Sequence, residues 1–232
     1  MEANMNTQEV DAKKPSLFGM ITSPGVQFEG MKTKKKVWGM FFFMALLQGL
    51  IGGLSAYVIH TSHEMLKMKR ELGELAGQSS LTSEVISGIG SSFVGVMVGT
   101  LFITAIYKMF MMFFGNDTPY KTLLNIVVYT NIVLIIGGLM NTILSLIFGT
   151  GMTQYTSLGL LFMEGTFAYG IGNTIEVFYV WNLVLIWLGL HITAGLSKVK
   201  ALIPIIILFI IKAFFLSAII VLLAKFLPGM PM

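Results

Sequence analysis

The chain has 232 residues, of which 55% are hydrophobic and only 11% are charged, and it contains no cysteine. A soluble domain carries about 25% charged residues, so this composition excludes an ordinary water-soluble fold. The missing cysteines exclude disulfides, zinc–thiolate sites and thiol nucleophiles. The formal net charge of +4 comes largely from lysines before the first long apolar run, which favours anionic lipid over nucleic acid as the partner of that cluster.

Residues 1–36 are predicted to form a cytoplasmic N-terminal segment. Residues 1–14 are polar and are expected to be disordered, because they offer few apolar side chains to bury. Farther along, Ser23 can cap a helix and Pro24 fits its first turn. We therefore expect an interfacial amphipathic helix within residues 15–31 that leads into the membrane, with an ordered loop as the alternative.

Five later stretches are apolar and long enough to cross a bilayer, for which a helix needs about 20 residues. Together they predict an all-α polytopic bundle, with five transmembrane helices, over residues 37–227. Lysines are more numerous on the side of the N-terminus, so the positive-inside rule predicts a cytoplasmic N-terminus and a C-terminus outside. The predicted spans are 37–59, 91–114, 122–148, 174–197 and 201–227.

The connections between the spans differ in character. Residues 60–90 are polar and charged with apolar residues at helical spacing, which predicts an amphipathic helix outside the hydrocarbon. Residues 149–173 form a glycine-rich loop, in which Leu158–Met163 is too short to cross and should lie on the bilayer surface or pack over the bundle. Residues 197–200 leave room only for a tight hairpin between the last two spans.

Small residues recur at spacing four in the first two predicted spans, which allows close approach of helix backbones. They could form an oligomer face, but packing inside one five-helix bundle is the simpler explanation. The residues concerned are Ala45, Gly49 and Gly53 in the first span, and Ser91, Gly95 and Gly99 in the second.

Lys212 is the most informative polar residue, because it lies roughly 18 Å into the last predicted span at 1.5 Å per residue. A lysine at that depth costs about 2.5–3.5 kcal/mol on insertion scales, so it should face the bundle interior, a water-filled cavity or a partner protein. Asn131 at similar depth, or His191 nearer the cytoplasm, could help to satisfy its ammonium group. No acidic residue is expected deep in a span, so an acid of another subunit is an alternative partner.

No catalytic or cofactor site emerges from the motifs. His60 and His63 with Glu64 resemble metal ligands, but a third protein ligand at suitable spacing is missing. Ser55 and His191 should lie at different depths and cannot form an intramembrane protease pair. The sequence lacks a P-loop, a nucleophile elbow and a complete dinucleotide-binding motif, so we expect no enzyme activity, no metal and no cofactor.

Two stretches resemble the YIP family, the Ypt/Rab-interacting multi-spanning membrane proteins, in its bacterial branch. The first is Ser23-Pro24-Gly25 with the residues up to Glu29, and the second runs from Ile175 to Ala201. The second stretch contains Trp181, Gly189, Gly195 and Ser197. The resemblance implies five spans and a cytoplasmic N-terminus. Eukaryotic members take part in vesicle traffic and GTPase binding, a role that is not carried over because the N-terminal segment here is short.

Some bacterial members of this family accompany ABC exporters. The resemblance therefore implies a non-enzymatic, multi-pass protein of the bacterial cell membrane that binds and helps assemble or regulate another membrane complex, such as the subunits of an ABC exporter, or that forms a homo-oligomer. Its other partner is the lipid bilayer, and no nucleic acid is expected. The alternatives are a small stand-alone transporter or channel, and a bilayer-shaping protein that uses its amphipathic segments.

Overall fold

A computed structural model describes residues 15–32, 36–72, 80–151 and 153–226 of the chain. Every regular element in these ranges is a helix apart from one isolated β-bridge, so the prediction of an all-α fold is confirmed. Four helices are long and apolar enough to cross a membrane: α3 (Trp38–Thr61), α5 (Leu81–Phe113), α6 (Tyr120–Phe148) and α9 (Lys198–Phe226). Residues 1–14, expected to be disordered, lie outside the described ranges.

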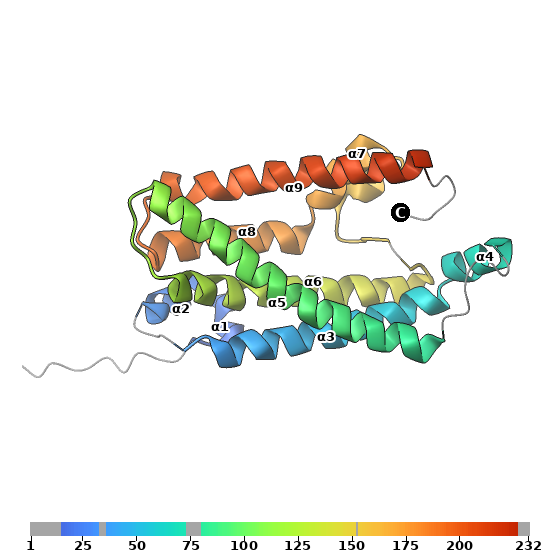
Figure 1. Ribbon diagram of the computed structural model, residues 1–232, viewed down its shortest axis with the longest axis horizontal. Coiled ribbons are helices and arrows are strands. Elements are labelled where there is room, and N and C mark those ends of the chain that lie inside the picture. Colours follow the sequence, from blue (N-terminus) through green and yellow to red (C-terminus); the bar gives the residue numbers. More distant parts are fainter. Residues whose placement is uncertain (1–14, 33–35, 73–79, 152, 227–232) are drawn as a thin grey trace, which may run out of the picture.

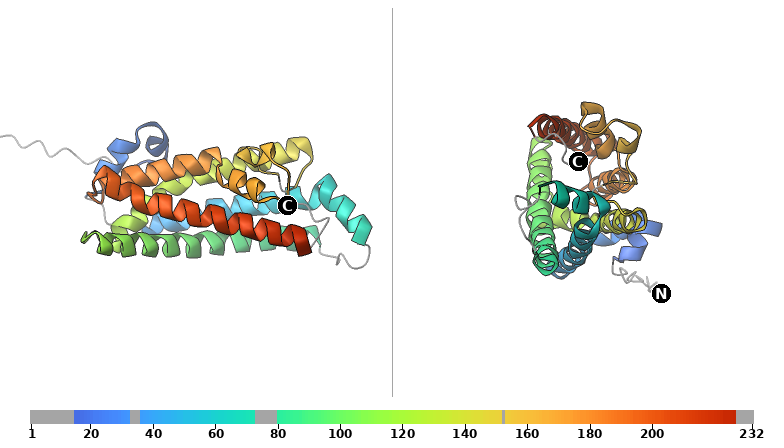
Figure 2. Two further views of the ribbon diagram at one scale, coloured as in Figure 1. Left: turned by 90° about the horizontal axis from the view of Figure 1, so that it is seen from above. Right: turned by 90° about the vertical axis from the view of Figure 1, so that its right-hand side faces the viewer.

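The long helices lie side by side and alternate in direction along the chain (Figure 1). One end of the bundle, here called the α2 end, carries α1 (Leu17–Thr22) and α2 (Pro24–Met31), the turn between α5 and α6, and the turn between α8 (Val177–Ile192) and α9. The opposite end, called the α4 end, carries α4 (His63–Leu72) and α7 (Phe167–Thr174). The end-on view in Figure 2 shows the helices gathered around α6.

The central position of α6 is visible in its burial. In its most apolar stretch 67% of the residues are buried inside the molecule, compared with only 11% for α5. α6 packs against α3, α5 and α8, whereas α9 packs against α7 and α8. The remaining faces of α5 and α9 carry exposed apolar side chains, as expected of helices whose surroundings are lipid.

The N-terminal segment forms two short helices where one was predicted. Ser16 caps α1 by accepting a hydrogen bond from the Gly19 amide, and Pro24 occupies the first turn of α2 as expected, although the Ser23 side chain makes no capping bond. Part of the apolar surface of the segment is buried, because Met20 and Phe28 are 0% exposed and belong to the main core, whereas Phe18 and Val26 remain exposed. These helices therefore cover the α2 end of α6 and α8.

The second long helix begins earlier than predicted, at Leu81 and not at residue 91. Ser80 caps it by accepting a hydrogen bond from the Ser83 amide. The carboxylate of Glu84, in the first turn, contacts side chains of α3 and α4. The amphipathic helix predicted within the polar stretch 60–90 is present as α4, which is separated from α3 by Ser62.

The predicted span 174–197 is broken near its start. The chain forms a short 3₁₀ turn, η2 (Leu158–Leu161), then α7, and then α8 with only 16 residues. The break falls at Ile175 and Glu176, where Glu176 caps the new helix. At 1.5 Å per residue α8 is about 24 Å long, so it covers only part of the length of α9.

Candidate functional site

A cavity of 680 Å³ lies in the half of the bundle toward the α4 end. It is bordered by α3, α6, α7, α8 and α9 and by the loop after α6, at the level where the short helix α8 begins. Most of its wall is apolar, with side chains such as Val58, Leu134 and Leu216, and hydroxyl, amide and charged groups lie among them. Its polar lining includes Ser55, Asn141, Gln154, Asn173, Glu176 and Lys212.

The ammonium group of Lys212 lies at this cavity, halfway along α9. Its Nζ is 3.3 Å from the centroid of the Tyr179 ring, a cation–π contact whose usual strength is about 0.5–2 kcal/mol. The Tyr179 ring is in turn stacked on Phe209 of α9, with 6.5 Å between the ring centroids. The Lys212 side chain remains exposed and forms no ion pair with any described carboxylate.

Glu176 lines the same cavity but is occupied by local hydrogen bonds. Its carboxylate accepts from the amides of Phe178 and Tyr179, at 3.0 and 2.6 Å, and so caps α8. It also accepts from the Thr156 hydroxyl at 2.6 Å. A negative charge is favourable at a helix N-terminus, so this carboxylate holds the α7–α8 break and the loop before it together.

Asn141 joins the loop to α6. Its amide donates to the Gly137 carbonyl at 3.1 Å and to the Thr156 hydroxyl at 2.7 Å, and its Oδ1 accepts from the Thr156 amide at 3.2 Å. Glu176 and Tyr179 were not among the residues that the sequence singled out for the site. Glutamate is not one of the residues that usually cap a helix N-terminus, so the sequence carried no clear signal of the break.

Lys212, Asn131 and His191 are not gathered at one place. Asn131 donates to the Thr100 hydroxyl at 3.1 Å and lines a second groove, of 450 Å³, between α3, α5 and α6. His191 contacts the Leu196 carbonyl at 2.7 Å, near the α2 end, and its ring is stacked on Trp187. α8 ends at Ile192 and α9 begins at Lys198, so in this antiparallel pair Tyr179 lies level with Lys212. Asn131 and His191 have partners of their own.

The two stretches that resemble the YIP family pack against each other. A Cβ atom at Gly189 of α8 would lie 2.9 Å from the ring of Phe28 in α2, so only glycine permits this approach. The Thr193 hydroxyl donates to the Phe28 carbonyl at 2.8 Å. Gly195 has φ of +70°, a left-handed conformation that suits glycine, and it makes the turn that precedes Ser197 and α9. Trp181 packs against the core from α8.

The amino-acid sequence matches a known protein family. Residues 18–226 match the profile of the Yip1 domain. The chain belongs to the Yip1-domain family. Membrane protein YknW of Bacillus subtilis (strain 168) is 33% identical over 217 residues, which cover 90% of this chain and 92% of that protein. No solved structure matches the chain.

Membership of the Yip1 family agrees with a multi-pass membrane protein. Proteins of this family are non-catalytic, and no enzyme domain was found in the chain. The matched region includes α1, α2 and all the long helices. The two short N-terminal helices are thus part of the Yip1 domain and not an appendage to it.

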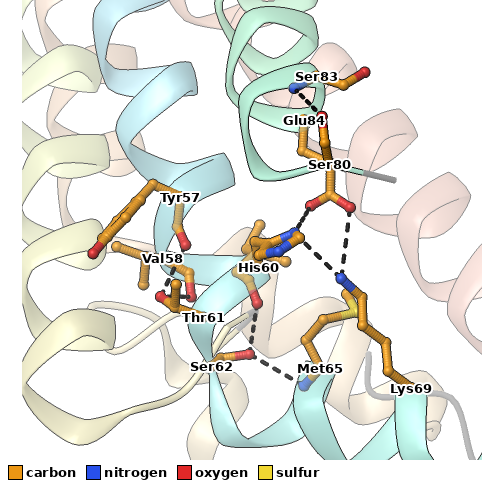
Figure 3. A network of polar contacts seen from close by, with 11 residues as sticks. Tyr57, Val58, His60, Thr61, Ser62, Met65, Lys69, Ser80, Ser83 and Glu84 are labelled. Atoms are coloured by element: carbon orange, nitrogen blue, oxygen red, sulfur yellow. Dashed lines mark hydrogen bonds and ion pairs between the residues drawn. The ribbon is translucent and has the colours of Figure 1, made fainter. Parts of the chain in front are cut away.

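The residues weighed as metal ligands contact two different parts of this Yip1-domain protein, the start of α5 and the loop after α6. His60 Nδ1 lies 2.6 Å from Glu84 Oε2, and Lys69 Nζ lies 3.3 Å from the same ring nitrogen (Figure 3). His63 contacts the Gly149 carbonyl at 3.2 Å, and the Glu64 carboxylate accepts from the Gly151 amide at 3.0 Å. Within the described ranges, no three His, Cys, Asp or Glu side chains are placed to hold a metal ion.

The two small-residue faces of the Yip1 bundle have different surroundings. Ala45, Gly49 and Gly53 are buried between α3 and its neighbours, and a Cβ at Gly49 would lie 3.3 Å from the Ile89 carbonyl oxygen. On α5 the contact is made one step away from the predicted face, because a Cβ at Gly88 would lie 2.7 Å from the Gly52 carbonyl oxygen. Positions further along the predicted face are open: a Cβ at Gly95 or Gly99 would have nothing within 4 Å, and the exposed Ser91 precedes them.

Proposed function

We propose that this chain is a non-enzymatic partner protein that binds another membrane complex and helps to assemble or regulate it. Its membership of the Yip1-domain family supports a role without catalysis. The resemblance to bacterial members of that family points to an ABC exporter as the complex. The location that goes with this role is the bacterial plasma membrane, with the N-terminus in the cytoplasm and five spans, α8 being the fourth.

The face of α5 that contains Ser91, Gly95 and Gly99 carries this proposal. Small residues let helix backbones approach closely in lipid, where packing is the main attraction between helices. Here they lie on the least buried of the long helices. Gly95 and Gly99 border the groove between α3, α5 and α6, and a Cβ at either position would meet nothing within 4 Å. A helix from a partner protein, or from a second copy of the chain, fits such a face.

A double variant tests the face. Gly95→Leu/Gly99→Leu should leave the fold intact, because both positions are open, but should keep a partner helix at a distance. We expect recovery of the partner in mild detergent to fall about fivefold or more, which corresponds to about 1 kcal/mol. Val98→Leu is the matched control, since Val98 is 61% exposed on the same helix.

The partner is identified by mass spectrometry of the co-purified material from native membranes. Exporter subunits would support the proposal, and a second copy of the chain would indicate a homo-oligomer. Equal recovery with the wild type and the double variant would refute the role of this face.

The cavity gives some support to a second candidate, a stand-alone transporter. Against it, the lining of the cavity extends along α6 only as far as Leu134, and residues 123–131 beyond it are all buried. Substrate flux into liposomes that contain the purified chain alone would favour the transporter.

The bilayer-shaping alternative would rest on Phe18 and Val26, the exposed apolar residues of α1 and α2, since Met20 and Phe28 are buried in the core. Tubulation of vesicles by the purified protein would favour it.

A further inference from the structure

We propose that the cavity around Lys212 binds the anionic head of an amphiphile, namely the phosphate or carboxylate group of a lipid. This inference is independent of the partner protein proposed above. It rests on two observations: the hydrogen-bond donors in the cavity have capacity left whereas the acceptors are largely used, and an apolar wall lies beside them.

The donors of the cavity have capacity left. Lys212 has three N–H donors, which donate to no described acceptor and lie over the face of Tyr179; the Glu176 carboxylate attracts its ammonium group from farther away without forming an ion pair. Asn173 uses its Oδ1 to accept from the Ser157 hydroxyl at 2.8 Å, while its Nδ2 donates to no described residue. The Gln154 side chain also lines the cavity and has no hydrogen-bond partner in the described part of the chain.

The acceptors of the cavity, in contrast, are largely used. The Glu176 carboxylate accepts three hydrogen bonds, and the Asn141 amide is bonded through both its oxygen and its nitrogen. The Thr142 hydroxyl donates to the Gly138 carbonyl at 2.8 Å and contacts the Ser55 hydroxyl. The groups of the cavity that are still free to bind a ligand are therefore an ammonium group and amide N–H groups. Donors of this kind recognise an oxyanion.

Size and surroundings favour the head of an amphiphile over a small inorganic ion. Binding sites for small molecules usually have volumes of about 300–1,000 Å³, and this cavity has 680 Å³. Val58, Leu134 and Leu216 form apolar parts of its wall, against which an alkyl chain can lie. An ammonium among membrane-spanning helices attracts an anion more strongly than one in water does, because the local dielectric constant is lower.

The test is lipid binding to the purified full-length protein, measured by native mass spectrometry from detergent micelles. We expect phosphatidylglycerol to be retained in preference to phosphatidylcholine. In Lys212→Gln this preference should fall about tenfold, the effect of losing one hydrogen bond to a charged group. Lys212→Arg should keep the preference. Lys225→Gln should also keep it, because it removes the same charge from the same helix but away from the cavity.

A second variant keeps the test valid if Lys212→Gln fails to fold, as judged by gel filtration and circular dichroism. Asn173→Asp preserves the acceptor that binds Ser157 but replaces the free N–H₂ group by a negatively charged oxygen, so it should weaken anion binding in a protein that still has Lys212. Retention of phosphatidylglycerol unchanged in both variants, with both folded, would overturn the proposal.

Competition identifies the source of the anion. Displacement of phosphatidylglycerol by oleate would show that a carboxylate on an alkyl chain suffices, which supports the proposal. If only a second phospholipid with a negatively charged phosphate head displaces phosphatidylglycerol, the proposal is supported with lipid phosphate as the anion. Equally strong displacement by glycerol 3-phosphate would show that the alkyl chain contributes nothing, and would overturn the amphiphile as the ligand.

Discussion

Gly189 shows how a single residue connects distant parts of this chain. It lies where α8 meets the Phe28 ring of α2 and a side chain of α6, so the two stretches by which the family was recognised are joined at one contact. Their pattern was visible in the sequence, but their contact was not, because 160 or so residues separate them and helical spacing carries no information about such pairs.

Replacement of Gly189 by alanine should therefore destabilise the bundle. The new Cβ would lie 2.9 Å from the Phe28 ring, and overpacking of a close-packed interior typically costs about 1–3 kcal/mol. The measurement is thermal unfolding in detergent, followed by circular dichroism. Gly39→Ala is the matched control, because a Cβ at Gly39 meets nothing within 4 Å. Equal melting temperatures for the two variants would contradict the close packing at Gly189.

Lys212 and its neighbours show the limit of residue-by-residue prediction. The depth of Lys212 in an apolar stretch was enough to single it out from the sequence, and the structure places it at a cavity. Tyr179 and Glu176 were not predicted as its neighbours, because depth counting assumed a helix that continues to residue 197. α8 ends at Ile192 and residues 193–197 form the turn, so Tyr179 lies level with Lys212.

At the scale of helices, α4 is held by polar contacts at its start and by one cluster of charges. None of residues 63–70 is buried, whereas His60, Lys69 and Glu84 join the ends of α3, α4 and α5 (Figure 3). The amphipathic character of α4 was predicted from the sequence, but the partner of its lysine was not, because Glu84 was placed in a connection and not at the start of α5.

Glu84→Gln should loosen α4 without unfolding the bundle. Loss of the carboxylate charge weakens the contact with the His60 ring and the longer-range attraction of Lys69, so amide hydrogen exchange over 63–72 should become faster, by about fivefold for a loss of roughly 1 kcal/mol. Glu29→Gln is the control at the α2 end, where Glu29 pairs with Lys32 at the surface, a kind of pair that contributes little. Unchanged exchange in α4 of Glu84→Gln would show that the cluster does not hold this helix.

The small-residue faces illustrate a second limit at this scale. Spacing four describes the open row Ser91, Gly95 and Gly99 and also the neighbouring pair Gly88 and Ser92, which the structure places against α3. The sequence alone cannot rank two rows of similar small residues on one helix, since their difference lies in what the partner helix presents.

For the whole molecule, composition and helix length were sufficient to predict an all-α membrane protein. The number of spans stays a prediction, because α8 is shorter than a typical spanning helix. So does the orientation, which rests on the positions of the lysines. Among the described residues, Lys32 and Lys198 lie at the α2 end, and Lys69 and Lys225 lie in elements that reach the α4 end.

Cysteine labelling tests the orientation directly, because the chain has no cysteine of its own. In intact cells a membrane-impermeant maleimide should label Lys225→Cys from outside. It should label Lys32→Cys only after the membrane is made permeable, since five spans place these positions on opposite sides. Labelling of both positions from the same side would show that the number of spans is even.

The turn between α8 and α9 is short, and this affects how the protein enters the bilayer. Only residues 193–197 separate the two helices, so the insertion machinery meets them as one hairpin. α9 is the most apolar long helix, with a mean hydropathy of 3.0, and it can retain its shorter neighbour by direct attachment. A chain cut after residue 192 would leave α8 without this anchor, and quality-control proteases should then degrade the nascent product.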